Sequence, residues 1–143
     1  MNNFVMVIDD SAIVRKIVET CLRREGFVVK SFPDGIEALR WLTQPDACIP
    51  ALVFLDINMP KADGYRIAGH LKSKPAFAET VIVMLTRRNG VIDRLKARIS
   101  GAKHYMTKPF TIQDIVAVTC NYLGAPRHDE FYHPMQAAGS PLR

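Results

Sequence analysis

The sequence predicts an open α/β domain, in which a parallel β-sheet is covered by helices on both faces. Five short apolar runs alternate with five segments whose apolar residues recur at helical spacing. The runs are continuously apolar, which is typical of strands buried on both faces. The chain has 143 residues, of which 48% are hydrophobic and 23% charged, and this suits one globular domain with a sizeable core.

The expected strands are short and rich in β-branched and aromatic residues. They cover Phe4 to Ile8, Val28 to Phe32, Ala51 to Leu55, Val81 to Leu85 and Lys103 to Thr107. Turn-forming residues such as Pro33, Asp34 and Gly35 separate strands from helices. Because each strand is followed by a helix, right-handed crossovers are expected to make the strands parallel.

The expected helices lie between these strands. They cover Ser11 to Arg24, Ile36 to Leu42, a segment after Gly64 that ends before Pro75, Val91 to Ile99, and a final helix that Thr111 caps and that reaches Leu123. Residues 124–143 have no clear periodicity. We therefore expect a domain over residues 1–123 and a C-terminal tail or linker over residues 124–143.

Charge and cysteine content narrow the function classes. The 19 Lys and Arg against 14 Asp and Glu give a net charge of +5, but the basic residues are spread along the chain, so direct nucleic-acid binding is not expected. No apolar run approaches the roughly 20 residues of a membrane span, and the N-terminus lacks a cationic leader; a cytoplasmic protein without membrane insertion is expected. Cys21, Cys48 and Cys120 form no CxxC pair and are predicted to be reduced core thiols.

Polar residues follow four of the five strands. The first strand delivers Asp9 and Asp10, the third Asp56, the fourth Thr86, and the fifth Lys108 with Pro109 after it. Carboxyl ends of parallel strands share one edge of the sheet, where ligands bind in this architecture. Asp56 ends an apolar run in the stretch VFLDINMP, and Pro60 cannot extend a central strand, so we expect Asp56 at an exposed strand end.

Three neighbouring carboxylates repel each other unless a cation neutralises them. Mg²⁺, which prefers oxygen ligands, is the expected cation, and Mn²⁺ can substitute for it. Mg²⁺ also favours phosphate oxygens, so a phosphoryl group is the expected second ligand and a carboxylate the nucleophile that accepts it. Lys108 can then pair with the phosphoryl group, and Thr86 can donate a hydrogen bond to it.

Each residue alone also has an ordinary structural explanation. Asp9, Asp10 and Ser11 can cap a helix, and Asp56 can form a turn. Thr86 can cap a helix, and a single Lys108 is usually a solvated lysine. The arrangement of all of them at strand ends favours the phosphoryl site over these separate explanations.

The sequence resembles the receiver domain of two-component response regulators, the CheY-like family. The motifs that carry the resemblance are VIDDS (7–11), FLDINMPKADG (54–64), VIVMLT (81–86) and GAKHYMTKPF (101–110), and the resemblance covers residues 4 to about 123. It implies a flavodoxin-like (βα)5 fold, a doubly wound parallel sheet of five strands in the order 2-1-3-4-5.

The resemblance also implies roles for individual residues. Asp56 matches the phosphoacceptor. Asp10 matches a direct ligand of Mg²⁺ and Asp9 one that acts through water, while Asp56 and the main-chain carbonyl of Asn58 complete the protein ligands. Thr86 and Tyr105 match the switch hydroxyl and the switch aromatic. Lys108 matches the lysine that binds the phosphoryl group, and the Lys108–Pro109 peptide bond is expected to be cis.

The function that the resemblance implies is signalling. A sensor histidine kinase, expected to be of the chemosensory type, phosphorylates the domain. The face made by the fourth helix, fifth strand and fifth helix then changes its contacts with a downstream protein. Apart from its own phosphorylation and dephosphorylation, no enzyme activity is expected. Tyr105 also has a simpler interpretation, as a half-buried strand aromatic.

Three positions bear on phosphorylation rates. Arg87 follows the switch hydroxyl where the family usually has a small residue, and a long cation there either screens the site or attracts a phosphodonor. Asn58 and Arg88 match variable positions that tune phosphoryl lifetime.

The stretch from Leu85 to Phe110 is also similar to stand-alone receivers of type IV pilus twitching motility and chemosensory signalling. The basic residues within it can equally form a solvated helix face.

Two other functions fit part of the pattern. A degenerate receiver would act as an adaptor between proteins without phosphorylation. This chain, however, retains the residues that phosphorylation needs, namely Asp9, Asp10, Asp56, Thr86 and Lys108. A phosphatase of the haloacid dehalogenase type also uses an aspartyl nucleophile. That class expects a second acid two residues later, where this chain has Asn58.

Overall fold

The computed structural model describes residues 2–59, 63–87 and 90–126. Five parallel strands form one sheet in the order β2-β1-β3-β4-β5. The strands are β1 (Phe4–Ile8), β2 (Val28–Phe32), β3 (Leu52–Asp56), β4 (Val81–Thr86) and β5 (His104–Thr107). The predicted fold class and strand order are therefore confirmed. Residues 60–62, 88–89 and 127–143 lie outside the described residues, and with them Arg88 and its expected role in phosphoryl lifetime.

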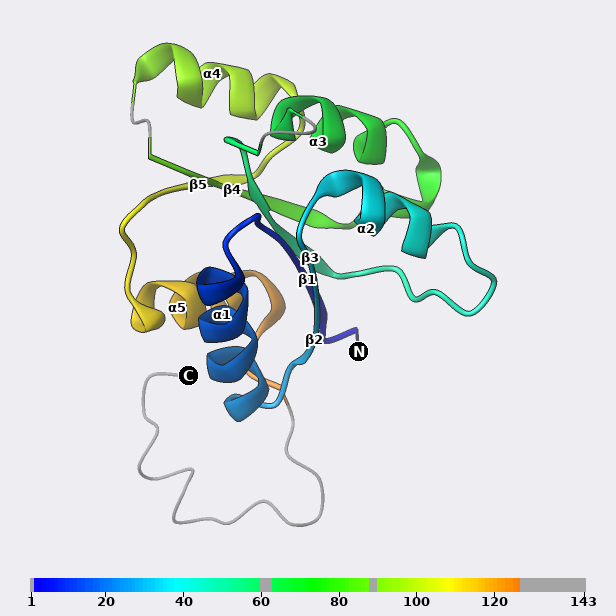
Figure 1. Cartoon of the computed structure of the whole chain (residues 1–143), viewed down its shortest axis with the longest axis vertical. Coiled ribbons are helices and arrows are strands. Elements are labelled where there is room, and N and C mark those ends of the chain that lie inside the picture. The colour runs from blue at the N-terminus through cyan, green and yellow to red at the C-terminus, as the bar shows by residue number, and fades with distance from the viewer. Residues whose placement is uncertain (1, 60–62, 88–89, 127–143) are drawn as a thin grey trace.

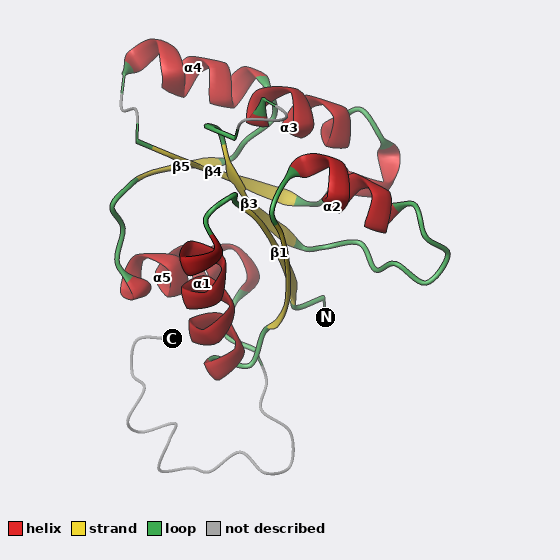
Figure 2. Cartoon of the chain, viewed as in Figure 1, coloured by secondary structure: helices red, strands yellow, loops and turns green. Residues whose placement is uncertain are grey.

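Helices cover both faces of the sheet, as Figures 1 and 2 show. The helices are α1 (Ala12–Arg24), α2 (Gly35–Leu42), α3 (Gly64–Lys72), α4 (Val91–Ile99) and α5 (Ile112–Leu123), with a short 3₁₀ helix at Pro75–Phe77. Helices α1 and α5 lie on one side, and α2, α3 and α4 on the other. Among the described residues, no helix combines the length and the apolar character needed to cross a membrane.

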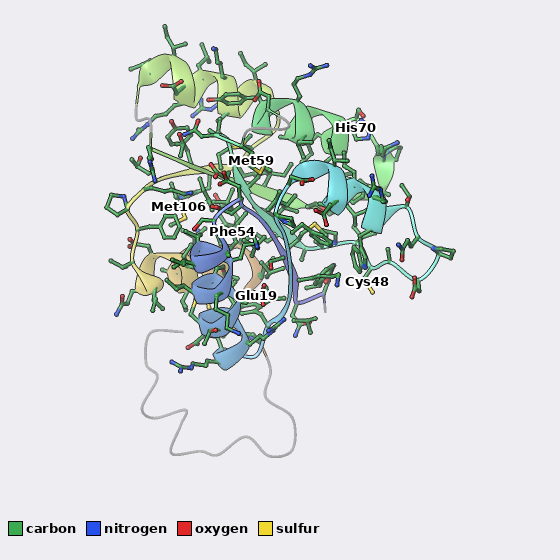
Figure 3. The ribbon with its side chains drawn as sticks, in the orientation of Figure 1. Glu19, Cys48, Phe54, Met59, His70 and Met106 are labelled. Carbon is green, nitrogen blue, oxygen red and sulfur yellow. The ribbon has the colours of Figure 1, made fainter. Side chains whose placement is uncertain are left out.

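The sheet separates two hydrophobic cores. Phe54 and Met106 pack toward α1 and α5, whereas Met59 belongs to the core under α2 and α3 (Figure 3). The three central strands are buried on both faces, which explains their continuously apolar sequences. The cores hold the strand ends in fixed positions, so the side chains that follow or end the strands have defined places.

Element boundaries differ from the predicted ones by one residue at several ends. β3 and β4 each extend to the polar residue that was expected to follow them, Asp56 and Thr86. Ser11 is the N-cap of α1 rather than its first residue, and its hydroxyl accepts a hydrogen bond from the Val14 amide. The 3₁₀ helix after α3 was not predicted, because a single Pro-initiated turn has no periodicity to detect.

The expectation for the cysteines is wrong at one position. Cys21 is buried and Cys120 is half-buried, but Cys48 is exposed in the long connection before β3 (Figure 3). Its apolar sequence neighbour Ile49 is exposed as well. All three thiols are free, as predicted. Apolar neighbours in a loop therefore did not indicate burial, because a loop lacks the period that turns residues inward.

The apolar side of α4 faces outward. Val91 is 83% exposed and Ile99 76%, and Ile92 and Leu95 are also exposed. Only Ala97 of this helix is buried. The apolar spacing correctly predicts the helix, but the larger side chains do not enter the core. This leaves an apolar surface on α4 beside β5.

Candidate functional site

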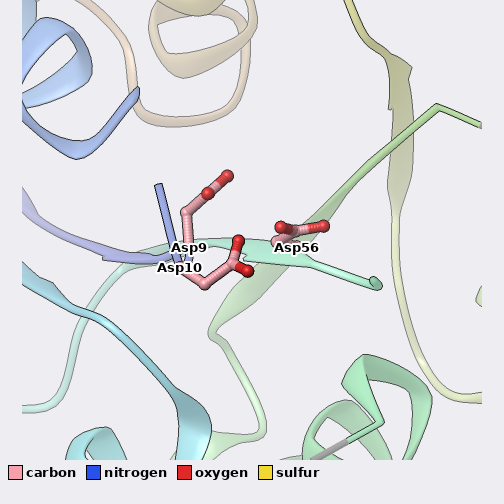
Figure 4. Close-up of side chains that lie close together, drawn as sticks. All are labelled: Asp9, Asp10 and Asp56. Atoms are coloured by element: carbon pink, nitrogen blue, oxygen red, sulfur yellow. The ribbon is translucent and has the colours of Figure 1, made fainter. Parts of the chain in front are cut away.

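Three carboxylates meet at the carboxyl end of the sheet (Figure 4). Asp9 and Asp10 follow β1 directly, and Asp56 is the last residue of β3. The strands β1 and β3 are neighbours in the sheet, and carboxylate oxygens of the three residues lie within 4.8 Å of one another. Asp9 and Asp56 are buried, whereas Asp10 is exposed. The predicted convergence of these residues is therefore present.

The Asp9 carboxylate is fixed through both oxygens. Oδ1 accepts a hydrogen bond of 2.8 Å from the Ser11 amide, and Oδ2 accepts one of 2.9 Å from the Lys108 ammonium. The Arg15 guanidinium donates to the Asp9 carbonyl at 2.7 Å. Ser11 therefore caps α1. Asp9 stabilises the turn before this helix through the Ser11 amide and forms an ion pair with Lys108. The capping explanation for this stretch is correct for Ser11 and incomplete for Asp9.

The Asp56 carboxylate is buried but accessible from a cavity. Its Oδ1 accepts a hydrogen bond of 2.9 Å from the Asn58 amide, and its Oδ2 lies 3.5 Å from the Lys108 ammonium. Because only 3% of the residue is exposed, the prediction of an exposed strand end is wrong. The strand continues through Asp56, and the carboxylate contacts the Asn58 amide and the Lys108 ammonium. The Asn58 main chain thus contacts this carboxylate through its amide.

Burial raises the pKa of Asp56 above its ordinary value, and the nearby Asp9 and Asp10 carboxylates raise it further. The Asn58 amide and the Lys108 ammonium act in the opposite direction, because both stabilise the ionised form. Keeping Asp56 ionised in this site therefore costs free energy when no further cation is bound. A divalent cation would remove that cost.

The absence of a side chain at Gly64 lets the first turn of α3 lie directly against the end of β3. A Cβ atom at this position would lie 2.8 Å from the Asp56 carbonyl oxygen and 2.8 Å from the Ile57 Cα. Both contacts are with main-chain atoms, which cannot move aside without displacing the end of β3. Asp63 caps the helix by accepting a hydrogen bond from the Tyr65 amide. Gly64 was predicted only as a helix boundary, because a close approach between backbones leaves no trace in a single sequence.

Lys108 crosses from the end of β5 to the carboxylates. Its peptide bond to Pro109 is cis, and its amide donates to the Thr86 carbonyl at 2.6 Å. Its side chain is 16% exposed, so the ammonium is largely enclosed between Asp9 and Asp56. It is not the solvated surface lysine of the ordinary explanation.

Thr86 and Tyr105 lie on the neighbouring strands β4 and β5. Thr86 is the buried last residue of β4, and Tyr105 is half-buried on β5. The guanidinium carbon of Arg94 lies 5.8 Å from the Tyr105 ring centroid, so α4 contacts this ring. Tyr105 thus has the position of the half-buried strand aromatic, and its contact with α4 connects it to the exposed apolar surface.

A cavity of about 240 Å³ opens above the carboxylates. It is lined by Asp10, Ser11, Val14, Asp56, Asn58, Arg87 and Lys108. Thr86 and Tyr105 are not among the lining residues in the described part of the chain. The donor set suits Mg²⁺ or Mn²⁺, because the three carboxylates supply hard oxygen ligands. The cavity also has room for waters and an oxyanion beside such an ion.

Comparisons with known proteins agree with this geometry. The family model "Response regulator receiver domain" matches residues 5–119. The chain is 38% identical over 112 residues to the protein PilG of Pseudomonas aeruginosa, and the match covers 78% of this chain and 81% of PilG. It is 38% identical to a probable transcriptional regulator, ycf27 of Guillardia theta, but spans only 42% of that protein's length.

Among solved structures, the chemotaxis response regulator CheY4 of Vibrio cholerae is similar in fold. The TM-score is 0.79 at 24% sequence identity, and the alignment covers 86% of this chain and all of CheY4. The family model, which matches most of the chain, and the similarity to PilG show that the chain belongs to the receiver domain family of two-component response regulators.

Proposed function

We propose that this chain is a signalling receiver in which Asp56 accepts a phosphoryl group from a sensor histidine kinase. The observation that carries the proposal is the convergence of Asp9, Asp10 and Asp56 with Lys108 at one cavity. Asp56 lines this cavity, so a phosphodonor can reach its carboxylate. The match to the receiver family supports the same role.

The transfer needs an ionised Asp56 carboxylate. One carboxylate oxygen attacks phosphorus, and the bond from phosphorus to the kinase imidazole nitrogen breaks with its electron pair staying on nitrogen. The Asn58 amide and the Lys108 ammonium stabilise the ionised nucleophile. Lys108 then pairs with the phosphoryl oxygens. Thr86 approaches the phosphoryl group through the conformational change that the family resemblance implies.

Asp10, Asp56 and the Asn58 main-chain carbonyl are the proposed direct ligands of Mg²⁺, and Asp9 is the ligand through water. When bound, Mg²⁺ neutralises negative charge on the carboxylates and the transferring phosphoryl group. Asp10 is the exposed one of the three carboxylates and has no side-chain hydrogen bond within the described residues, so it can bind an ion without losing a contact. Asp9 is already bonded at both oxygens, which favours its indirect role.

The proposed output is a change at the face formed by α4, β5 and α5. Leu95 and Ile99 expose apolar side chains there, and Arg94 connects α4 to the ring of Tyr105. An exposed apolar surface of this kind suits a protein partner. The similarity to PilG supports a chemosensory kinase as the donor and pilus-driven motility as the process controlled.

Metal-dependent phosphorylation tests the proposed function. The wild-type protein is incubated with acetyl phosphate, with Mg²⁺ or with EDTA, and its intact mass is measured. We expect a gain of one phosphoryl group with Mg²⁺ and none with EDTA, because the carboxylates repel an anionic donor when no cation is bound. Circular dichroism confirms that both samples are folded. Equal incorporation in EDTA would contradict the metal site.

Hydrogen–deuterium exchange tests the output face. Phosphorylation at Asp56 is expected to change exchange at amides of residues 91–107, because α4 and Tyr105 are in contact and share one conformational change. Residues 28–32 of β2, on the far edge of the sheet, serve as the internal control. A change confined to residues next to Asp56 would argue against transmission to this face.

A further inference from the structure

We propose that Arg87 is a second phosphoryl-binding cation, which captures the anionic phosphodonor before transfer. Arg87 follows β4 and lines the same cavity as Asp10, Asp56 and Lys108. The inference rests on the proposed function, since it concerns the donor that Asp56 attacks. Of the two roles that the sequence leaves open for this long cation, screening the site or attracting the phosphodonor, the proposal favours attraction.

The first observation is that the Arg87 side chain is available to bind a ligand. The side chain is exposed, and within residues 2–59, 63–87 and 90–126 it has no hydrogen bond or ion pair, although carboxylates line the same cavity. The two other cations beside the carboxylates, Lys108 and Arg15, already have partners. Lys108 lies 2.9 Å from Asp9 and 3.5 Å from Asp56, and the Arg15 guanidinium donates to the Asp9 carbonyl.

The second observation is the charge balance of the cavity. Three carboxylates face one enclosed ammonium, so a bound divalent cation brings the formal charge of this group only to neutrality. A neutral site has little attraction for a donor that carries two negative charges. Arg87 adds one positive charge at the cavity wall. Arg87 therefore attracts the anionic donor, whereas the charges of the enclosed groups and the bound cation neutralise one another.

The third observation is the position of Arg87 between two cavities. It also lines a larger groove of about 670 Å³ between α1 and α5, whose other walls are mainly apolar, such as Ile17, Phe110 and Ile115. A guanidinium at this junction can contact a phosphoryl group in the carboxylate cavity while the rest of the donor occupies the groove. Its planar set of N–H donors suits two phosphoryl oxygens at once.

The donor class that follows is a phosphorylated group with a dianionic phosphoryl end, such as an acyl phosphate or a phosphohistidine. Asp56 attacks phosphorus, and the leaving acetate or imidazole takes the electron pair of the broken bond. Arg87 holds the phosphoryl oxygens during the approach and does not exchange a proton. Capture should therefore affect the second-order rate constant more than the limiting rate at saturating donor.

The experiment compares phosphorylation rates of four proteins with acetyl phosphate at saturating Mg²⁺, at low and at high ionic strength. They are the wild type, Arg87→Gln, Arg87→Lys and Arg98→Gln, where Arg98 is an exposed residue of α4 that matches the loss of charge away from the cavity. Arg87→Gln is expected to lower the second-order rate constant about tenfold at low salt, which is the scale of one cation acting on a dianion at short range. Arg87→Lys should recover part of it.

High salt provides a readout that a structural effect would not change. The difference between wild type and Arg87→Gln should shrink severalfold, because salt screens the exposed charge. Arg98→Gln should behave as the wild type. An unchanged or faster rate in Arg87→Gln, or a salt-independent defect, would overturn the inference. If the folded wild type with Mg²⁺ takes up no phosphoryl group, the proposed function itself fails, and the inference with it.

Discussion

Asp56→Asn is expected to abolish phosphorylation by acetyl phosphate in the presence of Mg²⁺. The amide oxygen is a poor nucleophile, and neither Asp9 nor Asp10 is placed to replace it. Asp9 is fully buried and bonded at both oxygens, and Asp10 is the residue proposed to hold the metal. Intact-mass measurement detects the loss. Retention of full incorporation would show that another residue is the acceptor.

The same variant is expected to be more stable than the wild type when no metal is present. The Asn side chain can still accept the hydrogen bond from the Asn58 amide, while the like-charge repulsion from Asp9 and Asp10 disappears. At an effective dielectric constant of 20, one such repulsion is worth about 3 kcal/mol, and losing the Lys108 attraction offsets part of it. We expect a net gain of about 1 kcal/mol at pH 7 by denaturant unfolding in EDTA.

The stability difference between Asp56→Asn and the wild type should depend on pH. Folding raises the pKa of Asp56 above its ordinary value of 3.8, so between these two values the folded protein keeps a proton that the unfolded chain has lost. The contribution of Asp56 to wild-type stability therefore falls as pH rises through that window. The advantage of Asp56→Asn should be absent below pH 3.8 and complete above the folded-state pKa. A constant difference at every pH would contradict a charge effect.

Lys108→Met is expected to destabilise the protein by about 2–4 kcal/mol in EDTA. The substitution leaves the fully buried Asp9 carboxylate without its ion pair, and an uncompensated buried charge is costly. The loss also removes the contact with Asp56. Urea unfolding measures the change. Mg²⁺ should raise the stability of this variant more than that of the wild type, because the remaining carboxylates then depend on the metal for neutralisation.

The double variant Asp9→Asn with Lys108→Met is the matched control. It removes both charges of the pair, so it should recover at least half of the stability lost in Lys108→Met. If the double variant is as unstable as the single one, the loss comes from packing of the Lys108 side chain rather than from the unpaired Asp9. That result would contradict the role assigned to this ion pair.

Much of the fold could be predicted because it depends on periodicity. The continuous apolar runs indicated the buried strands, and the order of strands and helices indicated a parallel sheet. The rule that ligands bind at the carboxyl ends of parallel strands correctly predicted from the sequence that four side chains meet, those of Asp9, Asp10, Asp56 and Lys108. Boundaries were less certain, since a strand can extend into its own polar last residue, as β3 does at Asp56.

Other features could not be read from one sequence. The burial of Asp56 depends on groups that other parts of the chain bring to it, such as Lys108, and the need for Gly64 depends on how closely α3 approaches the Asp56 carbonyl. The exposure of Cys48 and of the α4 apolar side chains depends on which surfaces the rest of the chain covers. These are tertiary properties, and local residue pattern carries no record of them.

The most direct test of the central claim is to locate the phosphoryl group itself. The protein is phosphorylated with acetyl phosphate and Mg²⁺, treated with sodium borohydride, which reduces an aspartyl phosphate to homoserine, and digested for peptide sequencing by mass spectrometry. We expect homoserine at position 56, in the peptide that contains the end of β3, and aspartate at positions 9 and 10. Homoserine at either of those positions, or at none of the three in protein that has gained a phosphoryl group, would contradict Asp56 as the phosphoacceptor.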